Sequence, residues 1–401
     1  MLSKLNKDII LNTSSKGLSV IITIISFYFT TNYISLENIG IWTIFIFFVD
    51  LSFGLLFNSI RKLIIVSGKF VKPENLVMIG LQSIIVSYPL LLLFFFMSNF
   101  KIELIFSISI VFFLNGIRFL LLDVSSKKNQ YNKIFKYTTI ANFIWSTSII
   151  YLSISGFELY SFILAQIINS LIIILFYIRD FKHIFYYLNY KEIFDFQSSY
   201  NLVKKQNNFV YLFLNEISKF LSTKIDVFFI SNSFGNIQLG IFNRSSRVAK
   251  LPISILGDAI QKVVVTNFIE SEKKQIPKNK IFLVLIITLF FCFLIKNYSY
   301  FFFNIIFNDK SKINSIVSVF NILIFIFPFD LTNRLQNVKF NVNQDFKTLL
   351  FIKGSLLIIL ILYFSSSFIY NINSIAYGLV AYKFLLFLIT FLIQNFSNEK
   401  I

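Results

Sequence analysis

The apolar residues of this chain gather in long runs that short polar segments separate. A helix needs about 20 mostly apolar residues to cross roughly 30 Å of hydrocarbon. Runs of this kind have their cores at residues 15–34, 39–60, 76–98, 102–122, 137–156, 159–178, 208–231, 238–268, 281–304, 313–333, 347–370 and 374–395. The pattern therefore predicts an all-α integral membrane protein with about twelve transmembrane helices.

The basic residues predict the orientation of these helices. With the N-terminus inside, the inside segments hold 23 of the 37 Lys and Arg residues, the spans hold 10 and the outside loops hold 4. Because cytoplasmic loops carry the excess of Lys and Arg, we expect both ends of the chain in the cytoplasm. The outside loops are short, so we expect no exported domain.

The chain is expected to form two six-helix lobes. Residues 1–180 would form an N-lobe (helices 1–6), and residues 207–401 a C-lobe (helices 7–12). Residues 181–206 mix aromatic and charged side chains, which predicts a cytoplasmic amphipathic linker. The run Gly40-Ile41-Trp42 recurs as Gly240-Ile241-Phe242 half a chain later. This recurrence favours duplicated, parallel bundles, although Gly-Ile-aromatic also recurs by chance in a chain rich in Phe and Ile.

Composition excludes several function classes. Hydrophobic residues make up 56% of the chain and charged residues 14%, and the formal net charge is +18. With the basic residues distributed over membrane loops, this charge does not indicate nucleic-acid binding. A single Cys (Cys292) and a single His (His183) exclude disulfide scaffolds, zinc sites and most histidine-based catalysis.

Charged residues inside the spans are more informative, because each costs about 2.5–3.5 kcal/mol at the helix centre on insertion scales. Those that stand out are ten basic residues and four acidic ones, which leaves a surplus of six positive charges. They are Lys16, Arg118, Lys219, Lys224, Arg244, Arg247, Lys250, Lys262, Lys353, Lys383, Asp50, Glu216, Asp226 and Asp258. Lys16, Lys262 and Lys353 lie near inside ends and are expected to snorkel to the interface.

The seventh and eighth spans carry the densest charge. In the seventh, Glu216, Lys219 and Asp226 share one helical face, and in the eighth Arg244 and Asp258 cluster on one side. These faces are expected to meet in an aqueous cavity. The alternative is a set of buried structural ion pairs, which leaves the surplus positive charge unexplained.

Three further spans contain isolated charges or polar stripes. Asp50 lies near the middle of the second span, either as a protonatable coupling group or as the partner of Arg118 in the fourth. Lys383 has no evident partner on its own span, so we expect it to point inward. The first span carries a stripe of Asn, Lys, Ser and Thr from Asn12 to Thr30, which suits a hydroxylated ligand or interhelical hydrogen bonding. Pro89 and Pro328 could bend the third and tenth spans.

A cationic pocket in the membrane predicts an anionic ligand such as a phosphate or diphosphate. At this point the sequence resembles a known family. The runs Lys224-Ile225-Asp226, Gly240-Ile241-Phe242-Asn243-Arg244 and Leu251-Pro252 resemble the pattern of polysaccharide-export (O-antigen or capsule repeat-unit) flippases of the multidrug/oligosaccharidyl-lipid/polysaccharide (MOP) exporter superfamily. Phe242 stands where that family usually has Tyr, so it keeps the aromatic ring and lacks the hydroxyl.

The resemblance implies a function and a location. The substrate would be an oligosaccharide repeat unit of an O-antigen (lipopolysaccharide) or capsule, linked to undecaprenyl diphosphate. The protein would turn it from the inner to the outer leaflet of the bacterial inner membrane by alternating access through a cationic central cavity. Partners would be this lipid-linked oligosaccharide, membrane lipids, and the polymerase and glycosyltransferases of the same pathway. No covalent chemistry and no cofactor are needed, so we expect a transporter and not an enzyme, with proton or sodium coupling left open.

The expected roles of the charged residues follow from this hypothesis. The substrate-binding candidates are Arg118, Lys219, Arg244, Arg247, Lys250 and Lys383. The ion-coupling or salt-bridge candidates are Asp50, Glu216, Asp226 and Asp258.

Three rival functions remain open. A MOP-type transporter of another ligand, such as a peptidoglycan-precursor flippase or a drug exporter, is the main alternative, although exporters of cationic drugs would be expected to have an acidic cavity. A repeat-unit polymerase would need a sizeable outside loop, which this chain lacks. A membrane O-acyltransferase is disfavoured because His183 lies in the linker without an acidic motif around it.

Overall fold

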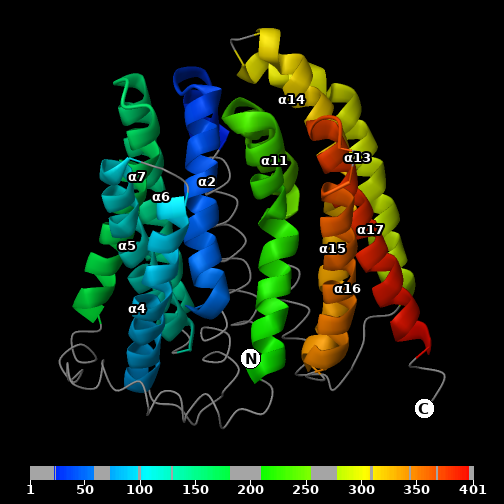
Figure 1. Ribbon diagram of the computed structural model, residues 1–401, viewed down its shortest axis with the longest axis horizontal. Coiled ribbons are helices and arrows are strands. Elements are labelled where there is room, and N and C mark those ends of the chain that lie inside the picture. Colours follow the sequence, from blue (N-terminus) through cyan, green and yellow to red (C-terminus); the bar gives the residue numbers. More distant parts are fainter. Residues whose placement is uncertain are drawn as a thin grey trace. The chain divides into compact units, whose positions relative to one another are not determined.

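The computed structural model describes residues 22, 24–57, 73–97, 101–127, 130–180, 209–253, 278–307, 310–342, 345–366 and 369–396. Within these ranges the chain is helical, and no strand occurs (Figure 1). Helices satisfy their own backbone hydrogen bonds, which hydrocarbon requires. The expected all-α membrane fold is confirmed, whereas the count of twelve spans in two lobes stays a prediction.

Most predicted spans coincide with a helix in the part of the chain that is described. The helices in the first half are α2 (Leu36–Ser52), followed by the π-helical turn η1 (Phe53–Phe57), α4 (Pro73–Met97), α5 (Ile102–Lys127), α6 (Tyr131–Ile154) and α7 (Leu159–Asp180). Those in the second half are α11 (Phe209–Pro252), α13 (Lys278–Ile306), α14 (Lys310–Leu323), α15 (Ile326–Val342), α16 (Phe346–Phe364) and α17 (Ile372–Phe396). Among the described residues, six segments are long and apolar enough to cross a membrane.

Two helices depart from the simple pattern for identifiable reasons. Helix α11 is interrupted at Gly235, whose φ of 81° suits glycine, so it contains two helical segments joined where the sequence predicts a short loop. The predicted tenth span is divided into α14 and α15. Pro328 near the start of α15 has no N–H to donate to Ile324, four residues earlier. The carbonyl of Ile324 accepts instead from the Phe327 N–H at 3.1 Å and from the Cys292 thiol at 3.4 Å.

The chain divides into two compact units. Unit 1 holds Met1–Tyr33 and Ile44–Phe220, and unit 2 holds Ile34–Thr43 and Leu221–Ile401. Helix α2 thus contributes its first turns to unit 2 and its remainder to unit 1. The predicted lobes at 1–180 and 207–401 remain a prediction.

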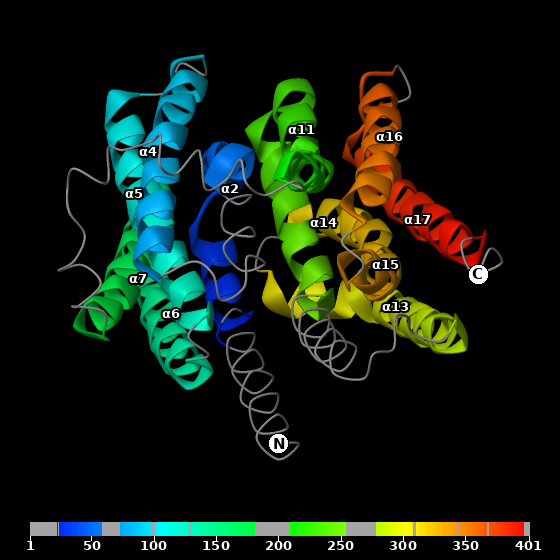
Figure 2. The ribbon, with the colours of Figure 1, turned by 90° about the horizontal axis from the view of Figure 1, so that it is seen from below.

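In unit 1, helices α4 to α7 form a group in which α5 contacts α4, α6 and α7 (Figures 1 and 2). The π-helical turn η1 packs on α5 through aromatic rings, with the Phe53 and Phe112 ring centroids 4.3 Å apart. Polar groups also join helices. The Asn115 side-chain oxygen accepts from Gln166 at 2.8 Å and from Ser170 at 2.9 Å, which connects α5 to α7.

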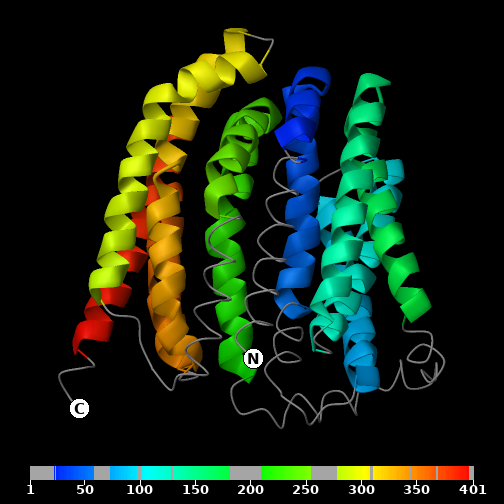
Figure 3. The same cartoon turned by 180° about the vertical axis from the view of Figure 1, so that it is seen from behind.

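In unit 2, α15 lies beside α13, α16 and α17, and α17 also contacts α14 (Figure 3). Asp345 caps α16 by accepting from the Thr348 N–H at 3.2 Å. This group places the polar helix α15 against the apolar helix α17, which carries Lys383.

The first turns of α2 cross α11 within unit 2 at two glycines. A Cβ added to Gly40 would overlap the backbone oxygen of Asn236, and one added to Gly240 would overlap that of Leu36. Small residues allow such close approach of membrane helices. The two contacts are reciprocal and offset by half a chain, as the predicted repeat would require of equivalent helices.

Candidate functional site: a charge cluster in unit 2

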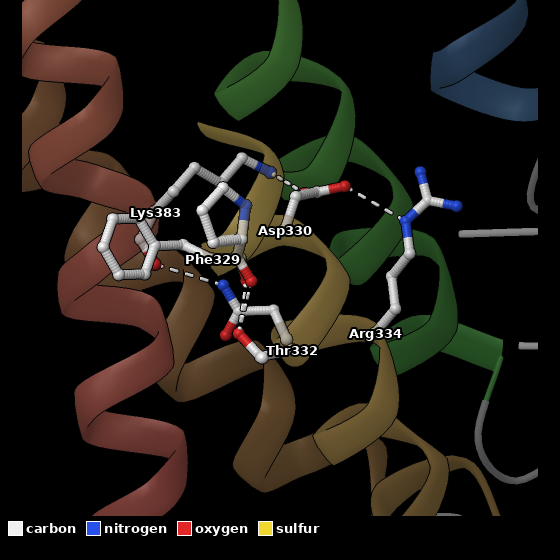
Figure 4. A network of polar contacts seen from close by, with 7 residues as sticks. Phe329, Asp330, Thr332, Arg334 and Lys383 are labelled. Atoms are coloured by element: carbon white, nitrogen blue, oxygen red, sulfur yellow. Dashed lines mark hydrogen bonds and ion pairs between the residues drawn. The ribbon is translucent and has the colours of Figure 1, made fainter. Parts of the chain in front are cut away.

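Three helices of unit 2 bring charged side chains together. Figure 4 shows the Asp330 carboxylate of α15 between Lys383 of α17 and Arg334 of α15. Lys383 Nζ lies 2.7 Å from Asp330 Oδ1, and Arg334 Nε lies 3.0 Å from Asp330 Oδ2. Arg334 follows Asp330 by one helical turn, so both project from the same face of α15. The Asn333 amide additionally donates to the Lys383 backbone oxygen at 3.1 Å.

Helix α11 extends this network from its two segments. Asp226 in the first segment interacts electrostatically with Lys224 and with Lys250 in the second. Lys250 in turn interacts with Lys383 and Asp330. We call these residues the charge cluster: Lys224, Asp226, Lys250, Asp330, Arg334 and Lys383.

The charge cluster contains four basic and two acidic residues and is therefore positive. The Asp330 and Lys383 side chains are each 16% exposed, so their pairing lowers the cost of placing them inside a helical unit. Asp226 is 3% exposed, and its Oδ1 has no hydrogen-bond partner in the part of the chain that is described. Lys250, by contrast, is exposed. The arrangement can hold an anion at Lys250 while Asp330 keeps Lys383 and Arg334 in place.

Arg247 lies one turn before Lys250 on α11 and is also exposed. Arg244, one turn earlier, is different: it is 4% exposed and donates from Nη2 to the Ile34 backbone oxygen at 2.9 Å. Its guanidinium also lies 5.6 Å from the centre of the Phe307 ring, at cation–π distance. Neighbouring Asn243 donates to Thr43 Oγ1 at 2.6 Å. The Arg244 side chain therefore joins α11 to the segment that leads into α2.

Four further candidates, Arg118, Asp50, Glu216 and Lys219, belong to unit 1. Arg118 is half-buried on α5, lies 5.6 Å from the Phe119 ring centre, and has no hydrogen-bond partner for Nε among the described residues. Asp50 is half-buried on α2, Glu216 is 8% exposed, and Lys219 is exposed on α11. Asp258 lies outside the described residues, as do Asn12 and Lys16 of the predicted polar stripe.

The structure thus brings together three predicted site residues, Asp226, Lys250 and Lys383. Lys383, for which the sequence offers no partner on its own span, pairs with a carboxylate from another helix, α15. Asp330 was missed although it lies within the predicted span 313–333, and Arg334 directly follows that span. The spacing of Asp330 and Arg334 by four residues was the signal that could have identified the pair.

Comparisons with known proteins agree with this membrane fold. A family described as "Polysaccharide biosynthesis protein" matches residues 74–295, which is more than half of the chain. No curated protein sequence matches.

Several solved structures share the fold at low sequence identity. One is the lipid II flippase MurJ in an inward closed conformation, with a TM-score of 0.67, 16% identity, and coverage of 96% of this chain and 87% of that chain. Another is a mutant of the Vibrio cholerae MATE transporter VcmN, with a TM-score of 0.61, 12% identity, and coverage of 100% and 98%. A third is a MOP superfamily transporter from Pyrococcus furiosus, with a TM-score of 0.57, 14% identity, and coverage of 98% and 95%. The binding pocket of that third protein is described as having reverse polarity that suggests a different function.

Proposed function

Since the chain belongs to this family of polysaccharide biosynthesis proteins and has a MOP-type transporter fold, we propose that it is a flippase for oligosaccharides linked to a polyprenyl diphosphate. The cargo would be the undecaprenyl-diphosphate-linked repeat unit of an O-antigen or capsule. It would be moved from the inner to the outer leaflet of a bacterial inner membrane, with both ends of the chain in the cytoplasm. Alternating access through a cationic cavity would carry it.

The positive charge cluster is the observation that carries this proposal. Basic side chains within membrane helices are costly and are retained where they face a partner or a polar pathway. In the charge cluster the Asp330 carboxylate already forms ion pairs with Lys383 and Arg334. The exposed ammonium group of Lys250 is therefore the group best placed for an anionic ligand. A diphosphate offers several charged oxygens and forms strong charge-assisted hydrogen bonds with Arg and Lys.

The sugar portion explains why a protein is needed at all. Each hydroxyl that enters hydrocarbon without a hydrogen-bond partner costs several kcal/mol, roughly 4–8 kcal/mol on the water-to-cyclohexane scale. A polar route removes most of this cost. Translocation makes and breaks no covalent bond, and the solved structures with this fold are those of transporters and flippases.

We assign residues to the diphosphate according to the exposure of their side chains. Arg247 and Lys250 are exposed and would contact it directly, and Lys383 would contribute through its electrostatic interaction with Lys250. Arg118 and Lys219 would bind anionic sugars or phosphate from unit 1. Arg244 would act as a positioning residue, because its guanidinium is buried against Ile34.

The candidate carboxylates would form ion pairs with basic residues or couple transport to an ion gradient. Asp226 is the best placed of them, because it is buried beside Lys224 and Lys250. Asp50, Glu216 and Asp258 complete the proposed set.

A peptidoglycan-precursor flippase is the second candidate, since the fold matches that of the lipid II flippase MurJ. Both cargoes carry a polyprenyl diphosphate, so the charge cluster suits either. A drug exporter for cations is disfavoured by the sign of the cluster.

Transport in vesicles tests the proposal. The purified chain would be reconstituted with a polyprenyl-diphosphate oligosaccharide that carries a fluorophore on its sugar. A membrane-impermeant quencher would then report arrival of the sugar at the outer leaflet. We expect translocation with this cargo and none in protein-free vesicles. Preferential translocation of a polyprenyl-diphosphate disaccharide–peptide would favour the second candidate, and no translocation of either cargo would contradict a flippase function.

A further inference from the structure

An apolar cavity of unit 2 lies between α16 and α17, two consecutive helices that are each long and apolar enough to cross a membrane. Its volume is about 230 Å³, and its walls are apolar and aromatic. In Figure 2 the two helices are drawn in orange and red, near the C-terminal end of the chain. We call this cavity the α16–α17 groove; its lining includes Leu356, Ile359, Tyr363, Tyr377, Ala381 and Tyr382.

The groove lies in the half of these helices that is nearer to the turn joining them. On α16 it begins at Leu356, in the second half of the helix, and on α17 it ends at Leu385, about midway along. The Tyr363 hydroxyl donates to the Ser374 backbone oxygen at 3.1 Å. This hydrogen bond uses the hydroxyl proton near the turn between the two helices. The groove therefore offers mainly hydrocarbon and ring surfaces to an occupant within one leaflet.

One residue of its wall, Tyr382, directly precedes Lys383 of the charge cluster. Tyr382 lines the groove and is 4% exposed, and its hydroxyl hydrogen-bonds with Ser222 on α11. The next residue, Lys383, pairs with Asp330. Tyr382 therefore lies between the apolar groove and the charge cluster, with Lys383 Nζ 6.0 Å from its ring centre. This combination suits a ligand with a hydrocarbon tail at one end and an anion at the other.

Depth in the membrane distinguishes between two lipids that have such ends. Lys383 is the twelfth of the 25 residues of α17, so it lies near mid-helix. A phospholipid that rests in the bilayer keeps its phosphate at the interface, roughly 15 Å from the midplane of a hydrocarbon core about 30 Å thick. Its phosphate would not reach the charge cluster while its tail filled the groove. A lipid whose diphosphate is being moved across the membrane would reach both.

We infer that the α16–α17 groove binds the polyprenyl tail of the cargo while its diphosphate lies at the charge cluster. This inference rests on the proposed function and adds to it a tail-binding site. Branched Leu and Ile side chains and tyrosine rings form extended dispersion contacts with a methyl-branched chain. The groove then guides the tail in the leaflet nearer to the α16–α17 turn.

Two neighbouring isoleucines provide a matched pair of variants. Ile359 lines the groove and is 53% exposed, whereas Ile358 is 60% exposed and lies outside the lining. Ile359→Trp would fill the groove, and Ile358→Trp would add the same bulk toward lipid. Ala381→Leu narrows the opposite wall and serves as a second groove variant. Elution on size exclusion and the thermal midpoint confirm that each variant folds.

Binding of radiolabelled heptaprenyl diphosphate to the purified full chain in detergent tests the inference, with inorganic diphosphate as the tail-free probe. We expect Ile359→Trp and Ala381→Leu to weaken heptaprenyl diphosphate binding at least about tenfold, because the lost dispersion contacts are collectively large. Ile358→Trp should not weaken it, and all variants should bind inorganic diphosphate as the unmodified chain does. Equal binding of heptaprenyl diphosphate by Ile358→Trp and Ile359→Trp would overturn the groove assignment while leaving the proposed function intact.

Two further outcomes separate the remaining explanations. If excess phosphatidylglycerol displaces heptaprenyl diphosphate from the unmodified chain but not from Ile359→Trp, the groove holds a phospholipid tail and the inference is wrong. If the unmodified chain binds neither heptaprenyl diphosphate nor inorganic diphosphate, the proposed function fails and the inference fails with it.

Discussion

The two units of the chain hold their helices together with different polar chemistry. In the interior of unit 1, Asn115 accepts hydrogen bonds from Gln166 and Ser170, so the contact joins uncharged groups. In unit 2 the comparable contact is ionic, with Asp330 between Lys383 and Arg334. Each ion pays a desolvation cost that a neutral amide avoids, and a neutral contact would suffice to position helices. Unit 1 also has an ion pair, Lys133 with Asp180 at 3.0 Å between α6 and α7, but Lys133 is 45% exposed. The proposed function would explain why the less exposed contact of unit 2 is ionic.

Removing the central carboxylate should have the largest effect on stability. Asp330→Ala leaves Lys383 and Arg334 partly buried without their shared partner, and loss of one member of a buried ion pair costs about 3–5 kcal/mol. The thermal midpoint of the purified chain in detergent measures this loss. Asp345→Ala is the control, because it removes only the α16 cap, worth about 1 kcal/mol. Equal shifts for the two variants would mean that the cluster is not a buried ionic contact.

Glycine substitutions compare the packing of the two units. Gly240→Ala places a methyl group against the backbone oxygen of Leu36, which cannot rotate away, so we expect a loss of about 1–3 kcal/mol, typical of overpacking. In unit 1, Gly80→Ala meets only the side-chain end of Leu120, which can change rotamer. Its effect on the thermal midpoint should be clearly smaller. A smaller shift for Gly240→Ala than for Gly80→Ala would contradict the close crossing of α2 and α11.

The neutral network should yield a moderate effect. Asn115→Leu removes the acceptor of Gln166 and Ser170 while keeping a similar volume, and unsatisfied buried donors cost about 1–3 kcal/mol. Thr147→Val removes a local, exposed hydrogen bond on α6 and should shift the thermal midpoint far less. If Asn115→Leu destabilised as much as Asp330→Ala, the contrast between the units would disappear.

Hydropathy predicted the helices well because each span must be apolar along its whole length. The predicted core 102–122 lies within α5, and 159–178 lies within α7. Partners of charged residues were harder to predict, because pairing across helices depends on rotation and packing that a single sequence does not contain. The sequence shows that Asp330 lies within a predicted span. Its contact with Lys383, 53 positions later, could not be predicted from the sequence. Arg244 illustrates the same limit, because its hydrogen bond to the Ile34 backbone oxygen joins positions 210 residues apart.

Replacing the exposed Arg247 should have the smallest effect on stability and a large effect on transport. In the double variant Arg247→Gln with Lys250→Gln, the change at the exposed Arg247 should alter the free energy of unfolding by no more than about 0.5 kcal/mol. The change at Lys250 should cost more than this, because Lys250 interacts with the buried Asp226. The thermal midpoints of the two single variants check these expectations. A large drop in stability for Arg247→Gln alone would contradict the first of them.

Translocation by the same double variant tests the central claim most directly. In vesicles that contain the fluorescent polyprenyl-diphosphate oligosaccharide, the initial rate of sugar arrival at the outer leaflet would be compared for the unmodified chain, the double variant and Lys101→Gln. Lys101 is an exposed basic residue outside the charge cluster and serves as the control. We expect the double variant to lose at least about tenfold in rate, because each charge-assisted hydrogen bond contributes about 1.5–3 kcal/mol, while Lys101→Gln keeps the unmodified rate. An unchanged rate in the double variant would contradict the account that unit 2 keeps its positive charge for an anionic, lipid-linked cargo.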